Sequence, residues 1–359
     1  MAMAKRSLRK ICIDTPGIDG LQVAVGVCDG AQSCIKVTKC TEGLHKKAFI
    51  LKMDNCCEVF AKLPNPDAGP ARFTIASQIA TRKLAWSIDA ASNPDGAEYI
   101  IEEKAPGVRL GSVWSRWPRD LKQQLITQVI DIENTLTGVG FNMHGCIYFK
   151  DDLRSLGVKL EEASIQSATT SIPALFAIGP LTTGELWNGV RSGMDLDRGP
   201  YLDPQSVNEA ASGNVLMHPD LHLDNIFVDP ETLQITRIVD WQSAFVALWF
   251  YHANVPRICA YREPLPEGWG VPERPEDFDS LSAEEQLKVD NDLERQILHK
   301  YYEAQVYKRS PRYWSLLEDK RVPIIRNPAW LVTRVALLPV DGIVDPEDYA
   351  YSPEEQPGS

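Results

Sequence analysis

Residues 215–242 read VLMHPDLHLDNIFVDPETLQITRIVDWQ, and this stretch decides the fold of the chain. Apolar runs alternate with polar segments in it, and the Asp229-Pro230 pair before the last run is typical of a turn. Three apolar runs predict short strands: 215–217, 226–228 and 235–239. Because a polar group is costly to bury without a partner, the dense polar segment between the first two strands indicates a functional site.

The polar segment carries side chains that act in catalysis and in metal binding: His218, Asp220, His222, Asp224 and Asn225. One interpretation is a phosphoryl-transfer site, which needs a carboxylate for the acceptor hydroxyl and two oxygen ligands for Mg2+. Asp220 fits the first need. Asn225 and Asp240 fit the second, because an antiparallel hairpin returns the chain to its starting point. His218 is then expected to hold the backbone of the loop.

Two other interpretations of this segment stay open at the level of its residues. The histidines and aspartates of residues 218–224 alternate, and hydrolytic zinc sites use such groups, although Pro219 disfavours the regular strand that would align them. The other alternative is structural, with the same side chains serving only as caps and turn residues.

The first 105 residues predict a small β-rich unit. Its expected strands are 34–39, 48–53, 58–64 and 97–101, with a helix at 71–84. Gly43 lies in the first turn and Lys62 in the third strand; a glycine turn can fold over phosphates, and a lysine can pair with them. Pro106 and Gly107 end the segment 102–107, which we therefore take as the boundary between two lobes.

The rest of the chain predicts a larger, mainly helical unit. Apolar residues recur on one helical face between Leu121 and Leu136, with Pro118 before them and Gly138 after them. Ser282 and Glu285 form the pattern of a capping box at the start of a second long helix. We divide the chain into an N-terminal extension (1–30), an N-lobe (31–105), a C-lobe (106–344) and an acidic, proline-rich tail (345–359).

Composition excludes several classes of function. The chain has 359 residues, a hydrophobic share of 44% and a net charge of −12, which argues against a general binder of nucleic acid or anionic membrane. No apolar run approaches the roughly 18 residues of a membrane span. The eight cysteines include no Cys-x-x-Cys pair, so we expect reduced thiols and a cytoplasmic location. The basic N-terminus, MAMAKRSLRK, keeps a mitochondrial location as the alternative.

These motifs resemble the aminoglycoside phosphotransferase and choline kinase group, and more closely a fungal subgroup of phosphotransferase-domain proteins. The resemblance runs from Ile35 to Arg334. Besides the central stretch, it includes EVFAKLPNP (58–66), GAEYIIEEKAPGVRLGSVW (96–114), DWQSA (240–244) and LHKYYEAQ (298–305). It implies a protein kinase-like α+β fold of two lobes, with a small antiparallel β-rich N-lobe and a larger, mainly helical C-lobe.

The resemblance also implies a reaction, the ATP- and Mg2+-dependent transfer of the γ-phosphoryl group to a hydroxyl of a small molecule. Carried over by position, Asp220 corresponds to the catalytic base, supported by His218, and Asn225 and Asp240 to the metal ligands. Three further positions would bind the nucleotide: Lys62 on the phosphates, Gly43 in the phosphate turn, and the hinge of Glu103 and Ala105 along the adenine. His222 and Asp224 are left as loop structure.

The first lobe departs from the pattern of the family. The helix glutamate that pairs with the lysine is replaced by Gln78, and the usually apolar hinge entry is Glu102, a carboxylate that is costly to bury unless paired or protonated. Gly43 is the one glycine of its turn, and the segment before the strand 97–101 is short, which predicts a missing strand. These departures favour the alternative function, a pseudokinase that binds nucleotide or acts as a scaffold. The sequence fixes neither the acceptor nor the oligomeric state.

Overall fold

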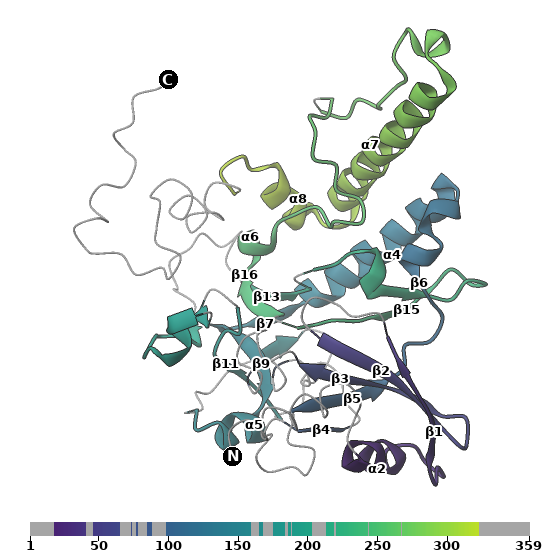
Figure 1. Ribbon diagram of the computed structural model, residues 1–359. Coiled ribbons are helices and arrows are strands. Elements are labelled where there is room, and N and C mark those ends of the chain that lie inside the picture. The colour runs from purple at the N-terminus through teal and green to yellow at the C-terminus, as the bar shows by residue number, and fades with distance from the viewer. Residues whose placement is uncertain are drawn as a thin grey trace.

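The structure is a computed structural model. It describes residues 18–40, 46–64, 73, 77, 85–87, 98–158, 165–167, 175–183, 186–187, 189–202, 213–218, 220–242, 244–266 and 268–322. An antiparallel sheet forms the N-terminal part, and the long helices lie in the C-terminal part (Figure 1). The mixed α+β class expected from the sequence is thereby confirmed.

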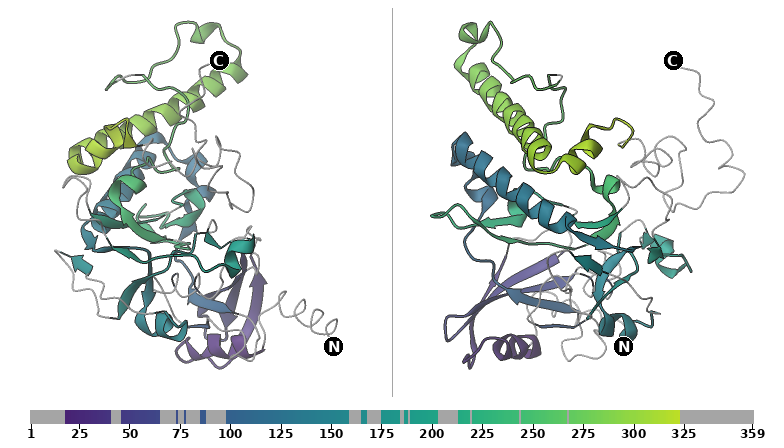
Figure 2. Two further views of the ribbon diagram at one scale, coloured as in Figure 1. Left: turned by 90° about the vertical axis from the view of Figure 1, so that its left-hand side faces the viewer. Right: turned by 180° about the vertical axis from the view of Figure 1, so that it is seen from behind.

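The N-terminal sheet has five strands in the order β1-β2-β3-β5-β4, all antiparallel. Their bounds are β1 (Cys34–Lys39), β2 (Lys46–Met53), β3 (Glu58–Pro64), β4 (Ala85–Ser87) and β5 (Tyr99–Glu103). One face of the sheet is covered by α2 (Ile18–Gly26), because Val59, Ala61 and Ile101 form a core with Ala24 and Cys28. Residues 18–28, expected as part of an extension, therefore pack on the sheet (Figure 2).

The sequence predicted that this sheet lacks a strand before β5. That prediction was wrong, because β4 occupies this position. β4 is only three residues long and pairs with β5 at its edge. Its central residue, Trp86, stacks on Phe149 of the C-terminal part with ring centres 5.8 Å apart, which gives so short a strand an anchor. Of the helix expected at 71–84, only Phe73 and Ser77 are described, and both are helical. Gln78 and Gly43 lie outside the described residues.

The chain leaves the N-terminal sheet and joins the central hairpin at once. β6 (Val108–Arg109) pairs with β14 (Ile226–Val228), which pairs with β15 (Ile235–Ile238). Gly107 makes this approach possible. Its φ is +84°, and a Cβ there would overlap the carbonyl oxygen of Val228, so that only glycine fits.

Two long helices form the centre of the C-terminal part. α4 (Arg119–Thr137) begins after Pro118 and ends at Gly138, and α7 (Ala283–Arg309) begins with the predicted capping box of Ser282 and Glu285. The apolar face of α4 packs on that of α7, and the two helices lie side by side in both views of Figure 2. α8 (Pro311–Glu318) packs on α7. The buried residues of the two long helices include Leu125, Ile126, Val129, Ile130, Leu298, Tyr302 and Val306. Full burial of one of the aliphatic side chains among them stabilises the folded state by about 1.5–3 kcal/mol.

The remaining elements are short and surround the hairpin. The strands are β7 (Val139–Phe141), β8 (Met143–His144), β9 (Cys146–Phe149), β10 (Ile165–Ser167), β11 (Phe176–Gly179), β12 (Tyr201–Leu202), β13 (Asn214–Met217) and β16 (Phe245–Leu248). The helices are α5 (Lys150–Ser155), α6 (Trp249–His252) and single turns η1 (Leu110–Ser112), η2 (Trp114–Arg116), η4 (Gly189–Gly193), η5 (Leu223–Asn225) and η6 (Phe278–Ser280). None of the helices in the described ranges is both long and apolar enough to cross a membrane.

Candidate active site

His218 fixes the start of the loop between β13 and β14. Its Nδ1 accepts a hydrogen bond from the backbone N–H of Asp220 at 3.2 Å, so Nε2 carries the proton and donates to the carbonyl of Val239 at 2.9 Å. Burial lowers the pKa of His218, which keeps this neutral tautomer at pH 7. The ring stands edge-on to Trp241, with centres 4.8 Å apart. The imidazole thus joins the loop to the far end of the hairpin.

Asn225 joins the other predicted residues of the loop. Its side-chain Nδ2 donates to the backbone carbonyl of Asp220 at 2.9 Å, and its backbone carbonyl accepts from the N–H of Val239 at 2.8 Å. Since Val239 precedes Asp240, the hairpin brings Asp220, Asn225 and Asp240 to one end. Asp240 has a φ of +66°, a left-handed conformation that aspartate tolerates better than most residues and that clusters at functional sites.

Asn225 and Asp240 are the residues at this end of the hairpin that could hold a cation. Because the amide nitrogen of Asn225 is used on Asp220, its Oδ1 is the atom left to act as a ligand. An amide oxygen and the carboxylate of Asp240 are hard oxygen donors, the kind of ligand that Mg2+ prefers. For the zinc interpretation, the described ranges contain no group of three or more His, Cys, Asp or Glu side chains arranged to hold a metal ion.

The carboxylate of Asp220 has a partner on each oxygen. Arg257 Nη1 lies 2.8 Å from Oδ1, and His222 Nε2 lies 3.3 Å from Oδ2. His222 also accepts a hydrogen bond from the N–H of Asp224 through Nδ1, which caps the η5 turn. The side chain of Asp220 remains 48% exposed, so a small molecule can still reach it.

Arg257 is the contact of this site that sequence reasoning missed. It lies 37 residues beyond Asp220, in the segment that follows α6, and no local pattern marks it. A distant arginine beside a loop aspartate becomes visible only when β16 and α6 return the chain to the loop.

Lys62 and Glu102 form a buried ion pair within the N-terminal sheet. Nζ lies 3.1 Å from Oε1, and the two residues are 7% and 5% exposed. In the register of β3 and β5, Phe60 faces Glu102 and Lys62 faces Ile100, so the pair is diagonal and lies on one face of the sheet. The Glu102 carboxylate, which would be costly to bury alone, is therefore paired. It gives Lys62 a countercharge, which the neutral amide of Gln78 could not supply.

The segment after β5 is tied to the central hairpin. Glu103 Oε2 lies 2.9 Å from Arg237 Nη2 of β15, and Thr236 Oγ1 donates to the carbonyl of Pro106 at 2.7 Å. Ala105, between them, is half-buried. This segment is the link that the structure provides between the pair Lys62–Glu102 and the loop of Asp220.

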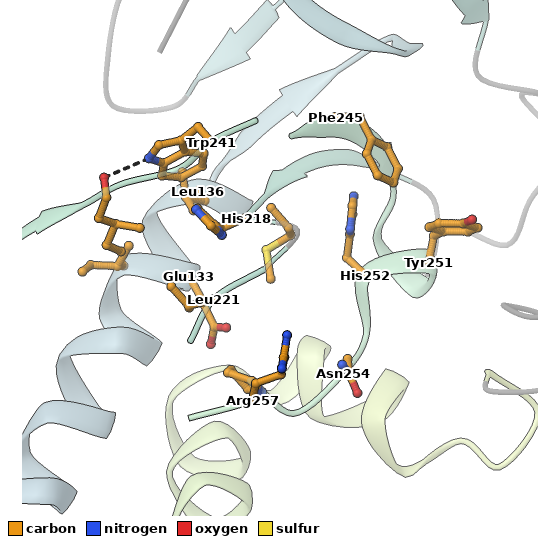
Figure 3. A pocket seen from close by; sticks show the side chains of 14 residues that line it. Glu133, Leu136, His218, Leu221, Trp241, Phe245, Tyr251, His252, Asn254 and Arg257 are labelled. Carbon is orange, nitrogen blue, oxygen red and sulfur yellow. Dashed lines mark hydrogen bonds between the residues drawn. The ribbon is translucent and has the colours of Figure 1, made fainter. Parts of the chain in front are cut away.

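A cavity of about 300 Å3 lies beside the loop (Figure 3). α4 contributes Glu133 and Leu136, the loop contributes His218 and Leu221, and residues 251–257 close the other side. Glu133 is buried and accepts a hydrogen bond from the hydroxyl of Tyr302 at 2.9 Å. Burial raises the pKa of Glu133 to about 8, so its carboxyl is protonated near neutral pH.

Comparison with known proteins gives distant similarities. No family model matches the chain. Two curated proteins of Aspergillus fumigatus, from strains A1163 and Af293, are both described as subtelomeric hrmA-associated cluster proteins. Each is 25% identical to this chain over 79% of it and 72% of the relative.

Solved structures of phosphotransferases also align with most of the chain. The GDP complex of aminoglycoside 2'-phosphotransferase-IIIa has a TM-score of 0.36 and 14% identity, over 81% of this chain and 94% of that one. An aminoglycoside phosphotransferase from Streptomyces rimosus has 0.35 and 14%, over 83% and 96%. Macrolide 2'-phosphotransferase type I has 0.29 and 12%, over 94% and 96%. At this distant level, the chain is similar in structure to aminoglycoside and macrolide phosphotransferases, the group that its motifs resemble.

Proposed function

We propose that this protein is an ATP- and Mg2+-dependent phosphotransferase that acts on a hydroxyl group of a small molecule. One observation carries the proposal, the two hydrogen bonds of Asn225. Its side-chain Nδ2 donates to the backbone carbonyl of Asp220, and its backbone carbonyl accepts from the N–H of Val239. The half-exposed carboxylate of Asp220 is therefore held at the same end of the hairpin as Asn225 and Asp240, the two residues proposed to bind Mg2+. Phosphoryl transfer needs this combination of positioning and charge stabilisation, and little else from the protein.

The polar residues at this end of the hairpin have different roles in the proposed reaction. Asp220 accepts the proton of the acceptor hydroxyl, and Arg257 and His222 orient its carboxylate. The amide oxygen of Asn225 and the carboxylate of Asp240 would hold Mg2+, which when bound supplies positive charge to the phosphates. His218 reacts with nothing and keeps the loop in register with the hairpin.

The nucleotide would lie between this loop and the N-terminal sheet. Lys62 is the proposed phosphate-binding lysine, and Glu102 holds its ammonium in place within the sheet. The backbone of Glu103 and Ala105 would take the base, because the contacts of Glu103 and Thr236 hold this segment against the hairpin. The proposed substrates are thus a purine nucleotide and a small alcohol.

A second candidate is a pseudokinase, and two observations favour it. Both carboxylate oxygens of Asp220 already have partners, and Lys62 is engaged by a carboxylate of its own sheet. Such a protein would bind nucleotide without transferring phosphate.

Two measurements separate the candidates. In the first, thermal shift is followed with ATP or GTP and Mg2+; both nucleotides are included because a similar protein is known as a GDP complex. In the second, radiolabelled γ-phosphate transfer is measured on a panel of small alcohols, sugars and amino alcohols.

Asp220→Asn is expected to lower transfer by at least about a thousandfold while nucleotide binding stays, because it removes the proton acceptor. Asp151→Asn is the matched control, since that aspartate is 90% exposed on α5. Transfer that is equal in Asp220→Asn and in the wild type would refute the assigned role. Nucleotide binding without transfer to any acceptor would favour the pseudokinase.

A further inference from the structure

The cavity beside the loop is a second site that the proposed reaction does not use. Asp220 is not among the residues that line it; His218 and Arg257 are, and both of them contact Asp220. Figure 3 shows the guanidinium of Arg257 rising into the space between Glu133 and Asn254. With about 300 Å3, the cavity has the size of a site for a small organic molecule.

Most of the wall is apolar and includes aromatic rings. Leu136 of α4, Met217 of β13, Trp241, Phe245 and Tyr251 all line it. Such a surface takes the ring or the short alkyl chain of a ligand, and each ligand carbon that leaves water contributes to binding.

The polar part of the wall determines the charge of the ligand. Arg257 carries a permanent positive charge, and it has five N–H donors, of which Nη1 reaches Asp220. Burial raises the pKa of Glu133 to about 8 and lowers that of His252 to about 4, so both are uncharged at pH 7. The groups facing Glu133 from α7 and from the segment after α6 are Tyr302 and Cys259, and burial raises the pKa of each well above its ordinary value. Among the side chains that line the cavity, Arg257 is thus the charged one at neutral pH, and its counterion Asp220 is not part of the lining.

We propose that this cavity binds a small monoanion with an apolar body, an aryl or alkyl carboxylate, whose carboxylate pairs with Arg257 while its body packs on Leu136 and Trp241. The amide of Asn254 lies at the same rim and supplies a further donor. Because the same arginine holds Asp220, a bound ligand shares a partner with the candidate base. Binding of the carboxylate does not require phosphoryl transfer, so this proposal and the proposed function can be tested independently.

The first test compares three probes with one ring: phenylacetate, its neutral amide phenylacetamide, and the cation phenethylamine. Calorimetry on the full chain at pH 7 is expected to show phenylacetate binding at least about tenfold more tightly than either of the others, because only it pairs with arginine. Equal binding of the three, no binding of phenylacetate, or tighter binding of phenethylamine would overturn the proposal. The last result would assign the cavity to cations through Glu133.

Two variants locate the binding. Arg257→Gln is expected to weaken phenylacetate about tenfold and to leave phenylacetamide unchanged. Its matched control is Arg274→Gln, because this arginine is paired with Asp290 and is not among the residues that line the cavity. Leu136→Trp fills the cavity and is expected to abolish binding, with circular dichroism as the check that it folds. Unchanged affinity for phenylacetate in Arg257→Gln would refute the site even if Leu136→Trp does not fold.

A pH series supplies an independent readout. As the pH rises from 7 to 9, Glu133 loses its proton and places a negative charge in the cavity, so the affinity for phenylacetate should fall. Glu133→Gln should remove this fall. An affinity that falls equally in wild type and Glu133→Gln would contradict the assignment of Glu133 to the wall of the site.

Discussion

Two of the ion pairs at the candidate active site join a carboxylate to a basic side chain, and they differ in how far they are buried. Lys62 and Glu102 are buried between neighbouring strands of one sheet. Asp220 and Arg257 are half-exposed or more, and they join the loop to the segment after α6. The buried pair has lost the solvation of both charges, so each partner depends on the other. The exposed pair retains solvent, so its value lies in orientation and not in stability.

The buried pair should give the largest effect on stability when it is cut. Glu102→Ala leaves the ammonium of Lys62 buried without its partner, and we expect unfolding to become easier by about 3–5 kcal/mol. Chemical denaturation measures the change. The double variant Lys62→Met with Glu102→Leu is expected to recover most of the stability but to lose the nucleotide-dependent thermal shift. A Glu102→Ala variant as stable as the wild type would show that the pair is solvated and not buried.

Glu133 sharpens the comparison, because this buried carboxyl keeps its proton where Glu102 has a cation. Burial raises its pKa from 4.5 to about 8. Between these values the folded chain holds the proton and the unfolded chain does not, so stability falls as the pH rises through this window. Glu133→Gln keeps an acceptor for Tyr302 and has no proton to lose. At pH 8.5 it should be more stable than the wild type by a few kcal/mol, on the order of the pKa shift.

That difference between Glu133→Gln and the wild type should shrink as the pH is lowered to 5. Thermal denaturation at both pH values checks it. A constant difference across the window would mean that Glu133 titrates normally.

The exposed pair should give the smallest effect on stability. Arg257→Gln is expected to change the free energy of unfolding by less than about 1 kcal/mol, because both charges remain solvated. If the protein transfers phosphate, the same variant should lower kcat and shift its pH profile, since the base loses its orientation. Arg257→Lys restores the charge and should recover part of the rate. A large loss of stability in Arg257→Gln would instead place the arginine in a structural role.

The difference between the two pairs also shows what could be predicted from sequence. Elements with a strong local signal were predicted: the strands of the central hairpin by their apolar runs, α4 by its periodicity, and α7 by its capping box. The mixed α+β class agrees with these signals, and the resemblance to phosphotransferases rests on the quoted motifs, above all that of residues 215–242.

Contacts set by tertiary packing were not predicted. The partner of Lys62 depends on the register of β3 on β5, which no single strand encodes. Arg257 reaches Asp220 only because β16 and α6 fold back on the loop. β4 carries too few residues for any periodicity and is held by the packing of Trp86. The assignments of Asp220, Asn225 and Asp240 to catalysis and metal binding remain predictions.

Gly107 has a consequence for motion between the two parts of the molecule. Its backbone lies directly on the carbonyl of Val228, and β6 beyond it is hydrogen-bonded to β14. A rotation of the N-terminal sheet away from the hairpin must therefore pivot before β6, in the short stretch between Glu103 and Val108. The ion pair of Glu103 and Arg237 spans this pivot. Because both of its side chains are in contact with solvent, breaking it costs little free energy. The backbone proposed to bind the purine is thus also the hinge about which the N-terminal sheet would rotate relative to the hairpin.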